Sequence, residues 1–195
     1  MEVNEPAVAY GKRHFSIEEY LEMENAATEK HEYYQGEIFA MSGAKLAHNI
    51  VTSNLHVSLG RILKGKPCRP FGSDLRIHIE KNTLFTYPDI SIICGEPKSL
   101  NDDDMNFLNS SVIIEVALLT TRERKARFKS YRDIPTLKEY IMVDTTSISI
   151  EDWFINSDGN WELKEYDNIT HSLELSSIQV SVELREIYEG TEVAK

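Results

Sequence analysis

The stretch VIIEVALLTTRERKARFKSYRDIPTLKEYIMV, residues 112–143, decides the fold. Its first five residues form a nearly continuous β-branched run, which is typical of a strand buried on both faces of a sheet. Residues 121–133 follow with a helical pattern that stops before Pro135, because the residue preceding a proline avoids helical geometry. Residues 139–143 then read as another buried strand. The order strand, helix, strand predicts a parallel crossover and places the chain in the α/β class.

The chain before this unit is expected to contain two helices and a strand. Ser16 and Glu19 have the spacing of a capping box and predict the start of a short helix. A turn at residues 35–36 leads into a strand that opens with Glu37. Apolar residues at helical period predict a longer helix over residues 46–63.

Strands are expected in the middle of the chain and toward its end. Residues 75–79 alternate polar and apolar side chains and residues 88–94 follow as an apolar run, so we expect an antiparallel pair or meander. Residues 147–154 and 161–166, separated by the turn Ser157–Asn160, predict a C-terminal β-hairpin. Together these patterns predict an α/β fold with a mixed β-sheet flanked by helices.

The length of 195 residues predicts a single domain over residues 15–190, preceded by a loose tail over residues 1–14. Hydrophobic residues make up 41% of the chain and charged residues 27%, as in ordinary globular proteins. The formal net charge of −11 excludes a protein that coats nucleic acid by its overall charge. A polyanionic partner therefore requires a local basic patch or a metal ion.

The cysteines and the apolar segments indicate where the protein works. Cys68 and Cys94 form no C-x-x-C motif, so we expect neither a zinc site nor a disulfide framework, which fits a reducing compartment. The first residues lack a basic region followed by an apolar one, and the apolar stretches are too short to span a bilayer. We therefore expect a cytoplasmic protein without a membrane partner.

Two carboxylates stand at unusual places in this pattern. Asp89 begins an apolar strand directly after Pro88, and Glu115 interrupts the buried run of residues 112–116. A buried ionised carboxylate costs several kcal/mol unless a partner compensates it. A divalent cation shared by both acids would do so, and carboxylate oxygens suit Mg²⁺ or Mn²⁺. The alternatives are a buried Glu paired with an Arg, and a Glu on the solvated face of an edge strand.

A basic segment, RERKARFKSYR at residues 122–132, follows Glu115 in this acidic chain. On a helix Arg124, Arg127 and Tyr131 share one stripe, which would face the carboxylates. Cations in such a stripe hold a scissile phosphate or a water molecule, so both arginines are candidate contacts of a cleft. The alternative is a solvated helix face, which is what most charge runs form.

Several motifs resemble those of the Uma2 family. They are Pro88-Asp89, Ile-Ile-Glu115-Val and the run from Tyr131 to Asp144, with further likeness at Tyr34-Gln-Gly-Glu37-Ile, His48, Ser73-Asp74-Leu-Arg76 and the Trp153/Trp161 hairpin. The likeness covers most of the chain. The family is similar to restriction endonucleases of the PD-(D/E)XK superfamily. The resemblance therefore implies a mixed sheet flanked by helices, a Mg²⁺ site and hydrolysis of DNA phosphodiester bonds.

The resemblance also implies roles for individual residues. Asp89 and Glu115 would hold Mg²⁺ or Mn²⁺, and Glu37 would be an accessory acid from the early strand. His48 and Asp74 become candidate polar contacts at the cleft. A homodimer is implied as well, because cleavage of both strands of DNA requires two sites.

The basic residue departs from the family pattern. The superfamily commonly has a Lys two residues after the Glu, where this chain has Ala117, and in Uma2 proteins the Lys lies on the following helix. Arg127 occupies that helical position here. A guanidinium, whose pKa lies above about 12, cannot act as a base, so Arg127 would orient water or bind phosphate. The sequence thus supports two hypotheses: a metal-dependent DNA hydrolase, and a catalytically degenerate nuclease fold that serves as a nucleic-acid-binding or assembly module.

Overall fold

The computed structural model describes residues 13–117 and 120–195. The helices in this part of the chain include the three helices that the sequence predicts, and Ser16 and Glu19 form the expected capping box.

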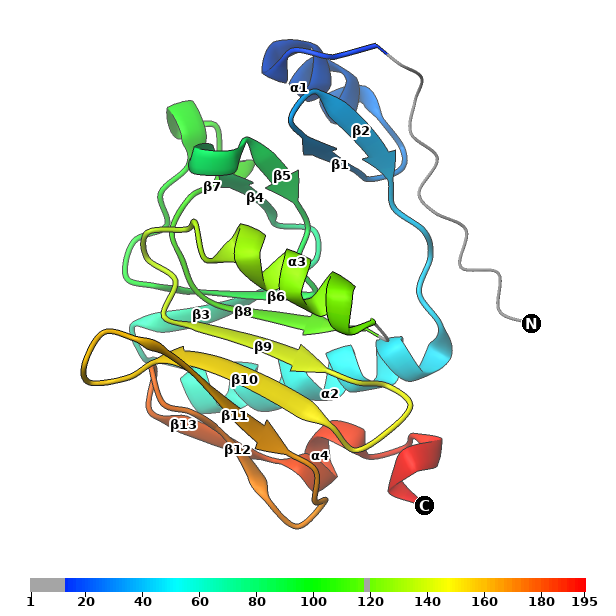
Figure 1. Cartoon of the computed structure of the whole chain (residues 1–195), viewed down its shortest axis with the longest axis vertical. Coiled ribbons are helices and arrows are strands. Elements are labelled where there is room, and N and C mark those ends of the chain that lie inside the picture. The colour runs from blue at the N-terminus through cyan, green and yellow to red at the C-terminus, as the bar shows by residue number, and fades with distance from the viewer. Residues whose placement is uncertain (1–12, 118–119) are drawn as a thin grey trace.

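The expected tail falls mostly on residues 1–12, which lie outside the described residues, so the tail and the domain limits stay predictions. None of the described helices is long and apolar enough to cross a membrane. The helices are α1 (Ile17–Ala26), α2 (Leu46–Leu63), α3 (Thr121–Tyr131) and α4 (Leu184–Tyr188), with short 3₁₀ helices at Glu80–Asn82, Leu100–Asp102 and Glu192–Ala194 (Figure 1).

A five-stranded sheet with the order β2-β1-β5-β4-β7 forms the upper part of the molecule in Figure 1. β4 and β7 run parallel, and the other neighbours are antiparallel. Aromatic and aliphatic side chains of α1, β1, β2 and β5 pack together as one core of this part. The strands are β1 (His31–Tyr34), β2 (Glu37–Ala40), β4 (Arg76–Ile79), β5 (Leu84–Thr86) and β7 (Asn106–Phe107).

A six-stranded sheet with the order β11-β10-β9-β8-β6-β3 forms the centre. β8 and β9 are parallel and α3 joins them, which confirms the predicted crossover. β10 and β11 form the predicted hairpin, whereas the hairpin of β12 and β13 was not expected. The six strands of this sheet are β3 (Cys68–Gly72), β6 (Ile90–Cys94), β8 (Ser110–Val116), β9 (Glu139–Val143), β10 (Ile150–Ile155) and β11 (Trp161–Tyr166). A separate two-stranded sheet is formed by β12 (Ser172–Leu175) and β13 (Val180–Glu183).

Strand β8 is buried on both faces of the central sheet. Val112, Ile114 and Val116 pack into a core that α2, α4 and the hairpin β12–β13 complete. Ile113, on the opposite face, packs with side chains of α3 and β4. Glu115 shares the face of Ile113, because residues two apart on a strand point the same way. The mixed sheet flanked by helices is thus confirmed, and its α3 face receives the buried acid.

The expected pairing of residues 75–79 with residues 88–94 is wrong. β4 pairs with β5 in the five-stranded sheet, whereas β6 pairs with β3 and β8 in the central sheet. Polar–apolar alternation could not reveal the partner, because every residue of β4 is buried. The chain crosses from one sheet to the other between Thr86 and Ile90, and Asp89 lies at this crossing.

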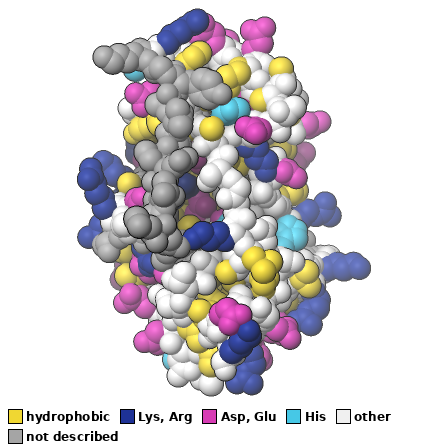
Figure 2. Space-filling model, turned by 90° about the vertical axis from the view of Figure 1, so that its right-hand side faces the viewer, with side chains coloured by type: hydrophobic (Ala, Val, Ile, Leu, Met, Phe, Trp, Pro, Cys, Tyr) yellow, Lys and Arg dark blue, Asp and Glu magenta, His cyan; other side chains and the backbone are white. Residues whose placement is uncertain are grey.

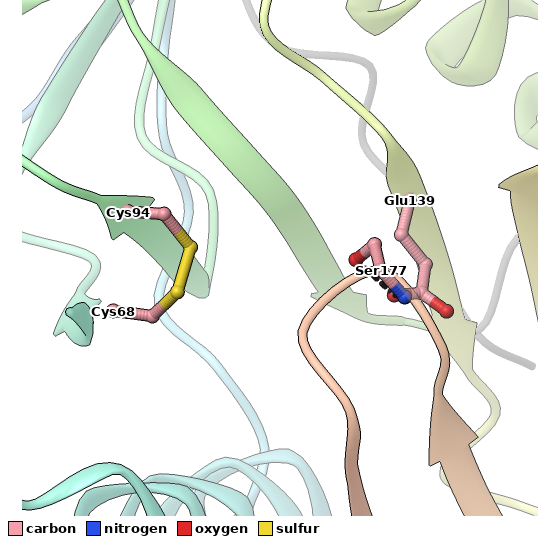
Figure 3. Close-up of a disulfide and its surroundings, with 4 residues drawn as sticks. All are labelled: Cys68, Cys94, Glu139 and Ser177. Carbon is pink, nitrogen blue, oxygen red and sulfur yellow. Dashed lines mark hydrogen bonds between the residues drawn. A yellow bond between two sulfur atoms is a disulfide. The ribbon is translucent and has the colours of Figure 1, made fainter. Parts of the chain in front are cut away.

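The expectation that the cysteines form no disulfide is also wrong. Cys68 on β3 and Cys94 on β6 are directly opposite in the antiparallel register and are joined by a disulfide (Figure 3). The two residues are 26 apart in sequence, so only strand pairing brings them together. Disulfides persist mainly in oxidising compartments. The argument from the cysteines for a reducing compartment therefore fails, and the cytoplasmic location stays a prediction.

A buried pair of acids fastens the hairpin β12–β13 to the central sheet. Glu139 on β9 accepts hydrogen bonds from the backbone amide and the hydroxyl of Ser177 at 3.3 and 2.5 Å (Figure 3). Asp152 on the adjacent strand is 1% exposed, and neither of its carboxyl oxygens accepts a hydrogen bond from a described residue. Burial raises the pKa of Asp152 to about 8, and the neighbouring Glu139 adds to the rise. Asp152 therefore retains a proton at neutral pH.

We expect the disulfide to stabilise the fold by about 2–4 kcal/mol, because it restricts the unfolded chain. Reduction should lower the urea midpoint of the wild-type protein, followed by circular dichroism, and leave that of the Cys68→Ser/Cys94→Ser variant unchanged. Equal midpoints for the wild type before and after reduction, with two titratable thiols in the native protein as purified, would contradict the bond.

We expect Asp152→Asn to be more stable than the wild type at pH 9 by about 5 kcal/mol, because each unit by which folding raises the pKa costs the ionised acid about 1.4 kcal/mol. An acid whose pKa is raised in the folded state favours folding at low pH. That stability is lost as the pH rises from the unfolded pKa near 4 toward the folded value of about 8. The difference should therefore vanish near pH 4, measured by urea unfolding between pH 4 and 9. Asp158→Asn, in the exposed turn between β10 and β11, is the control, and wild-type and Asp152→Asn profiles that run parallel would refute the assignment.

Candidate active site

A hollow of about 1000 Å³ opens where the two sheets meet α2 and α3. The segment 41–45, which runs from β2 down to α2 along one side of the molecule, forms part of its wall (Figure 1). Figure 2 looks onto this side, where acidic and basic side chains are interspersed. The charged and histidine side chains that line the hollow are Glu29, Lys30, Glu32, Lys45, His48, Asp89, Glu115 and Arg127.

Asp89 lies just before β6, beside the end of β8. Ile90 pairs with Ile114, so the next residue outward on each strand comes to the same edge of the sheet. Asp89 Oδ2 accepts a hydrogen bond from the Val116 amide at 2.7 Å. Antiparallel pairing therefore brings the two acids singled out from the sequence, Asp89 and Glu115, to the same hollow.

His48, near the start of α2, holds the other oxygen of Asp89. Its Nε2 lies 2.8 Å from Asp89 Oδ1. This hydrogen bond, assisted by the negative charges of Asp89 and Glu115, raises the pKa of His48 against the opposing effect of burial. The ring is therefore best placed to donate its proton to Asp89, which fixes the orientation of the carboxylate.

Glu115 is buried, and it has two protein donors. Tyr131 Oη donates to Glu115 Oε1 at 2.5 Å, and Arg127 Nη1 lies 3.2 Å from the same oxygen. Burial raises the pKa of Glu115 to about 7, with Arg127 opposing the rise and Asp89 adding to it. A buried Glu paired with an Arg was one of the alternatives open from the sequence, and the structure contains that pair.

Helix α3 delivers both donors to Glu115. The helix begins with a capping box in which Thr120 and Glu123 exchange hydrogen bonds. Phe128 anchors it by stacking on Trp153 of β10 with ring centroids 4.6 Å apart. Arg127 and Tyr131, one turn apart, then share the face toward the central sheet. The negative charge of Glu115 raises the pKa of Arg127, which remains a permanent cation.

The structure brings Glu32, rather than Glu37, to this group of side chains. Arg127 Nη1 lies 3.7 Å from Glu32 Oε1, and Thr86 Oγ1 donates to the same oxygen at 2.5 Å. Glu37 is exposed at the opposite end of the β1–β2 hairpin and does not line the hollow. The sequence motif contained Glu37 but offered no signal for Glu32.

Two other residues expected at the cleft lie outside the hollow's lining. Asp74 is 97% exposed and forms an ion pair with Lys30 at 2.7 Å. Arg124 contacts Asp144 and Glu151 at 3.0 and 2.7 Å, so it joins α3 to the central sheet. Lys30 does line the hollow, and nothing in the sequence pattern pointed to it.

The donor set fits a hard divalent cation. Asp89 and Glu115 line one hollow. The negative charge of Asp89 helps to raise the pKa of Glu115, and a cation bound nearby would lower that pKa again. Mg²⁺ is commonly held by one or two carboxylates with water as the remaining ligands. Among the described residues no cluster of three or more His, Cys, Asp or Glu side chains is arranged to hold a metal ion. The chain would therefore hold such an ion through two carboxylates.

Comparisons with known proteins give a consistent result. The chain matches the family model Uma2, described as "Putative restriction endonuclease", over residues 17–185. It is similar to "Uncharacterized protein slr1290" of Synechocystis sp., 32% identical over 192 residues that cover 97% of this chain and 98% of that protein. It is also similar to "Uncharacterized protein sll1609" of the same organism, 34% identical over 164 residues that cover 83% of this chain and 93% of that protein.

A solved structure shares the fold. It is the crystal structure of "a putative nuclease belonging to DUF820" from Anabaena variabilis, which superimposes with a TM-score of 0.72. The match covers 89% of this chain and 97% of that chain at 15% sequence identity, so it bears on the fold alone. The restriction endonuclease-like fold expected from the sequence is thereby confirmed.

We expect Asp89→Asn to lower the pKa of His48 toward the ordinary value for histidine, about 6.5. The hydrogen bond to Asp89 is the largest cause of the raised pKa, and an amide cannot accept it with a full charge. The imidazole chemical shifts, followed by NMR from pH 5 to 9, measure the change. Asp74→Asn, an exposed acid outside the hollow, should leave the titration unaltered. An unchanged His48 pKa in Asp89→Asn would contradict the pairing.

Proposed function

Because the chain belongs to the Uma2 family and has a nuclease-like fold, we propose that it hydrolyses DNA phosphodiester bonds with Mg²⁺ or Mn²⁺ held by Asp89 and Glu115. The observation that carries the proposal is the meeting of these two acids, from neighbouring strands, in one hollow. Glu115 is desolvated there, and a desolvated carboxylate beside a second acid favours a cation.

The residues around the two acids prepare them for this task. His48 and the Val116 amide hold the two oxygens of Asp89, and Tyr131 holds one oxygen of Glu115. Such contacts restrict the carboxylates to one orientation before a ligand arrives, and comparable outer contacts are worth 10–100-fold in metal affinity. These contacts support a pair of carboxylates that is already oriented for a cation.

A bound divalent ion would stabilise the charge that develops on the phosphate and make a water molecule more acidic. Arg127 supplies a permanent positive charge beside Glu115 and suits a phosphate oxygen. Its guanidinium cannot accept the proton of the attacking water. In this assignment Arg127 binds and orients the phosphate and takes no part in the proton transfer.

A second function, a catalytically degenerate nuclease fold that acts as a nucleic-acid-binding or assembly module, is favoured by the same Arg127. Its guanidinium already lies 3.2 Å from Glu115 and compensates the buried charge without a metal ion. The two functions differ in one property, which is whether a divalent cation joins this ion pair or remains excluded by it.

DNA as the partner is suggested by the family, and the charges around the hollow are compatible with it once a divalent ion is bound. Four Asp or Glu side chains and three Lys or Arg side chains line it, so a phosphate meets a nearly balanced surface. A divalent ion would make the surface attractive to a polyanion. The homodimer stays a prediction that rests on the need for two sites to cut both strands.

We expect metal-dependent cleavage of supercoiled and single-stranded DNA by the wild-type protein, and none by Asp89→Asn or Glu115→Gln. Arg127→Lys should raise cleavage, because an amine keeps the charge and adds a titratable proton. Arg127→Ala should lower it by about 10–100-fold, the usual weight of one charge stabiliser. Gel assays with Mg²⁺ or Mn²⁺ measure these rates.

Arg122→Ala is the matched control for Arg127→Ala, since Arg122 is an exposed residue of the same helix. Glu115→Gln serves as the blank for contaminating nucleases. Wild-type cleavage no greater than this blank, with DNA binding retained in a filter assay, would reject the hydrolase and support the binding module.

A further inference from the structure

We propose that single-stranded DNA binds a second surface outside the hollow, where α3 meets β10 and β11. Its bases stack on Trp153 and Trp161, and its phosphates contact cations of α3. The inference rests on the proposed function for the class of ligand, DNA, but it requires neither a divalent ion nor cleavage. The surface therefore suits both the hydrolase and the binding module.

Four apolar side chains of β10 and β11 form a partly exposed patch, the tryptophan face. Trp153 is opposite Leu163 and Ile155 is opposite Trp161 in the antiparallel register, so the four side chains share one face of the sheet. Ile155 and Leu163 are 38% and 37% exposed, and both tryptophans are partly exposed. In Figure 1 α3 lies in front of the central sheet, and no described helix lies in front of β10 and β11. Large apolar side chains gathered at an open surface mark an interaction site.

Phe128 of α3 fixes the two tryptophans. Its ring stacks on Trp153 with centroids 4.6 Å apart, and it meets Trp161 edge-on at 5.2 Å. Both indoles pack against the core beneath α3 and remain partly exposed. A ring that packing already holds loses little conformational freedom when a base stacks on it. Such stacking is tolerant of sequence, because every base has an aromatic face.

Three cations of α3 form a row beside the tryptophan face. Lys125, Lys129 and Arg132 are exposed and follow one another at helical spacing, so they share one stripe of the helix. The Arg132 guanidinium lies 5.5 Å from the centroid of the Phe128 ring, which places one end of the row next to the aromatic cluster. Phosphates of a strand whose bases lie on the tryptophans therefore meet this cation row.

The cation row keeps its charge for a ligand. The ion pairs that α3 forms with acids in the described part of the chain involve Arg124 and Arg127, and not the row. The row is thus a local basic patch on a chain whose formal net charge is −11. A local patch of this kind is what a polyanionic partner of so acidic a protein requires.

The acids nearest this surface are already engaged or lie at its far end. Glu151 and Glu165 are opposite each other at the other end of the two strands, and Arg124 lies 2.7 Å from Glu151. Asp133, just after α3, forms an ion pair with Lys81 at 2.5 Å. These acids therefore do not stand between the cation row and a phosphate backbone.

Single-stranded DNA fits the surface better than a second copy of the chain or a duplex. A two-fold contact through the tryptophan face would bring the same patch of both copies together, cation rows included, and like charges repel. A duplex keeps its bases stacked on one another. A single strand can instead place its bases on aromatic side chains while cations follow its backbone.

The surface also lies close to the hollow. Helical spacing places the cation row on the side of α3 opposite Arg127, which lines the hollow. A strand on the row is therefore about 10–12 Å, one helix diameter, from the candidate metal site. One strand can occupy both places.

The first test is intrinsic fluorescence, because both tryptophans of the chain belong to this surface. Oligodeoxythymidylate of about 16 nucleotides, the upper length of one single-strand site, should quench the emission saturably in the presence of EDTA. A duplex of equal length should bind about tenfold more weakly, because its bases are not free to stack. Inorganic polyphosphate, which has charge but no bases, should compete with the oligonucleotide without quenching.

The second test removes the stacking. Trp161→Ala should weaken oligonucleotide binding, measured by fluorescence anisotropy of a labelled strand, by about tenfold or more, the usual weight of one stacked base. Its salt dependence should stay unchanged, because no phosphate contact is lost. Tyr34→Ala, which removes an exposed aromatic side chain of the five-stranded sheet, is the control. Leu163→Glu, which puts a negative charge on the tryptophan face, takes the place of Trp161→Ala if that variant fails to fold, and it should also weaken binding.

The third test removes charge. Lys125→Ala/Lys129→Ala should weaken binding and lower the slope of log affinity against log salt by about 0.7 for each lost phosphate contact. Lys64→Ala/Lys66→Ala is the matched control, because these two exposed lysines follow α2, which packs on the opposite face of the central sheet. Its affinity and slope should equal those of the wild type.

The outcomes separate this inference from the proposed function. Binding that the tryptophan and lysine variants weaken, with no cleavage beyond that of Glu115→Gln, supports the surface and rejects the hydrolase. Metal-dependent cleavage by a protein whose variants bind like their controls rejects the surface and leaves the hydrolase standing. A wild-type protein that the oligonucleotide does not quench, and that sediments as a dimer which Leu163→Glu dissociates, overturns the inference in favour of an interface between copies.

Discussion

A carboxylate buried within a sheet, Glu115 on β8, is the constraint on which the rest of this structure depends. Its neighbours along the strand are apolar, and an uncompensated charge there would cost several kcal/mol. Arg127 and Tyr131 of helix α3 offset this cost by donating hydrogen bonds to Glu115. The parallel crossover from β8 to β9 holds α3 over the acid. The arrangement that permits the burial is also the arrangement that builds the hollow.

The protein contains a second buried acid pair, and it balances the charge in another way. Glu139 accepts hydrogen bonds from the turn between β12 and β13, and Asp152 retains a proton because burial raises its pKa to about 8. A proton removes the charge and leaves nothing for a ligand to bind. Arg127 instead opposes the rise in the pKa of Glu115 at the edge of a hollow, where another cation can still be attracted. The pair of Glu139 and Asp152 therefore suits fastening, and the acids around Arg127 suit chemistry.

The presence of arginine instead of lysine at position 127 affects the activity of the site but not the fold. A lysine at this place can give up its proton in a desolvated site, whereas a guanidinium beside two carboxylates only becomes more firmly charged. The nuclease-like fold does not depend on this difference, since either cation compensates Glu115. Sequence likeness therefore shows the family, whereas the chemistry of one side chain decides whether the protein turns over a substrate.

The sequence by itself determined the elements whose evidence is local. The apolar run of β8, the periodicity of α2 and the stop before Pro135 each reflect a few neighbouring residues, and all reappear in the structure. Asp89, Glu115 and Arg127 could also be identified from the sequence. A charged residue beside or inside a buried apolar run is unusual whichever strand it pairs with. His48 came only through likeness to a family motif.

Tertiary structure alone decided which residues meet across elements. Glu32 pairs with Phe39 and Tyr34 with Glu37, so both acids of the hairpin share one face and the alternation of side chains cannot choose between them. The tertiary structure selects Glu32 over Glu37, because the end of the hairpin that carries Glu32 lies against the central sheet. The disulfide, the separation of β4 from β6 and the contacts of Glu32 have the same origin. Each depends on contacts between strands far apart in the chain, and local patterns specify which face of a strand is buried but not what lies against it.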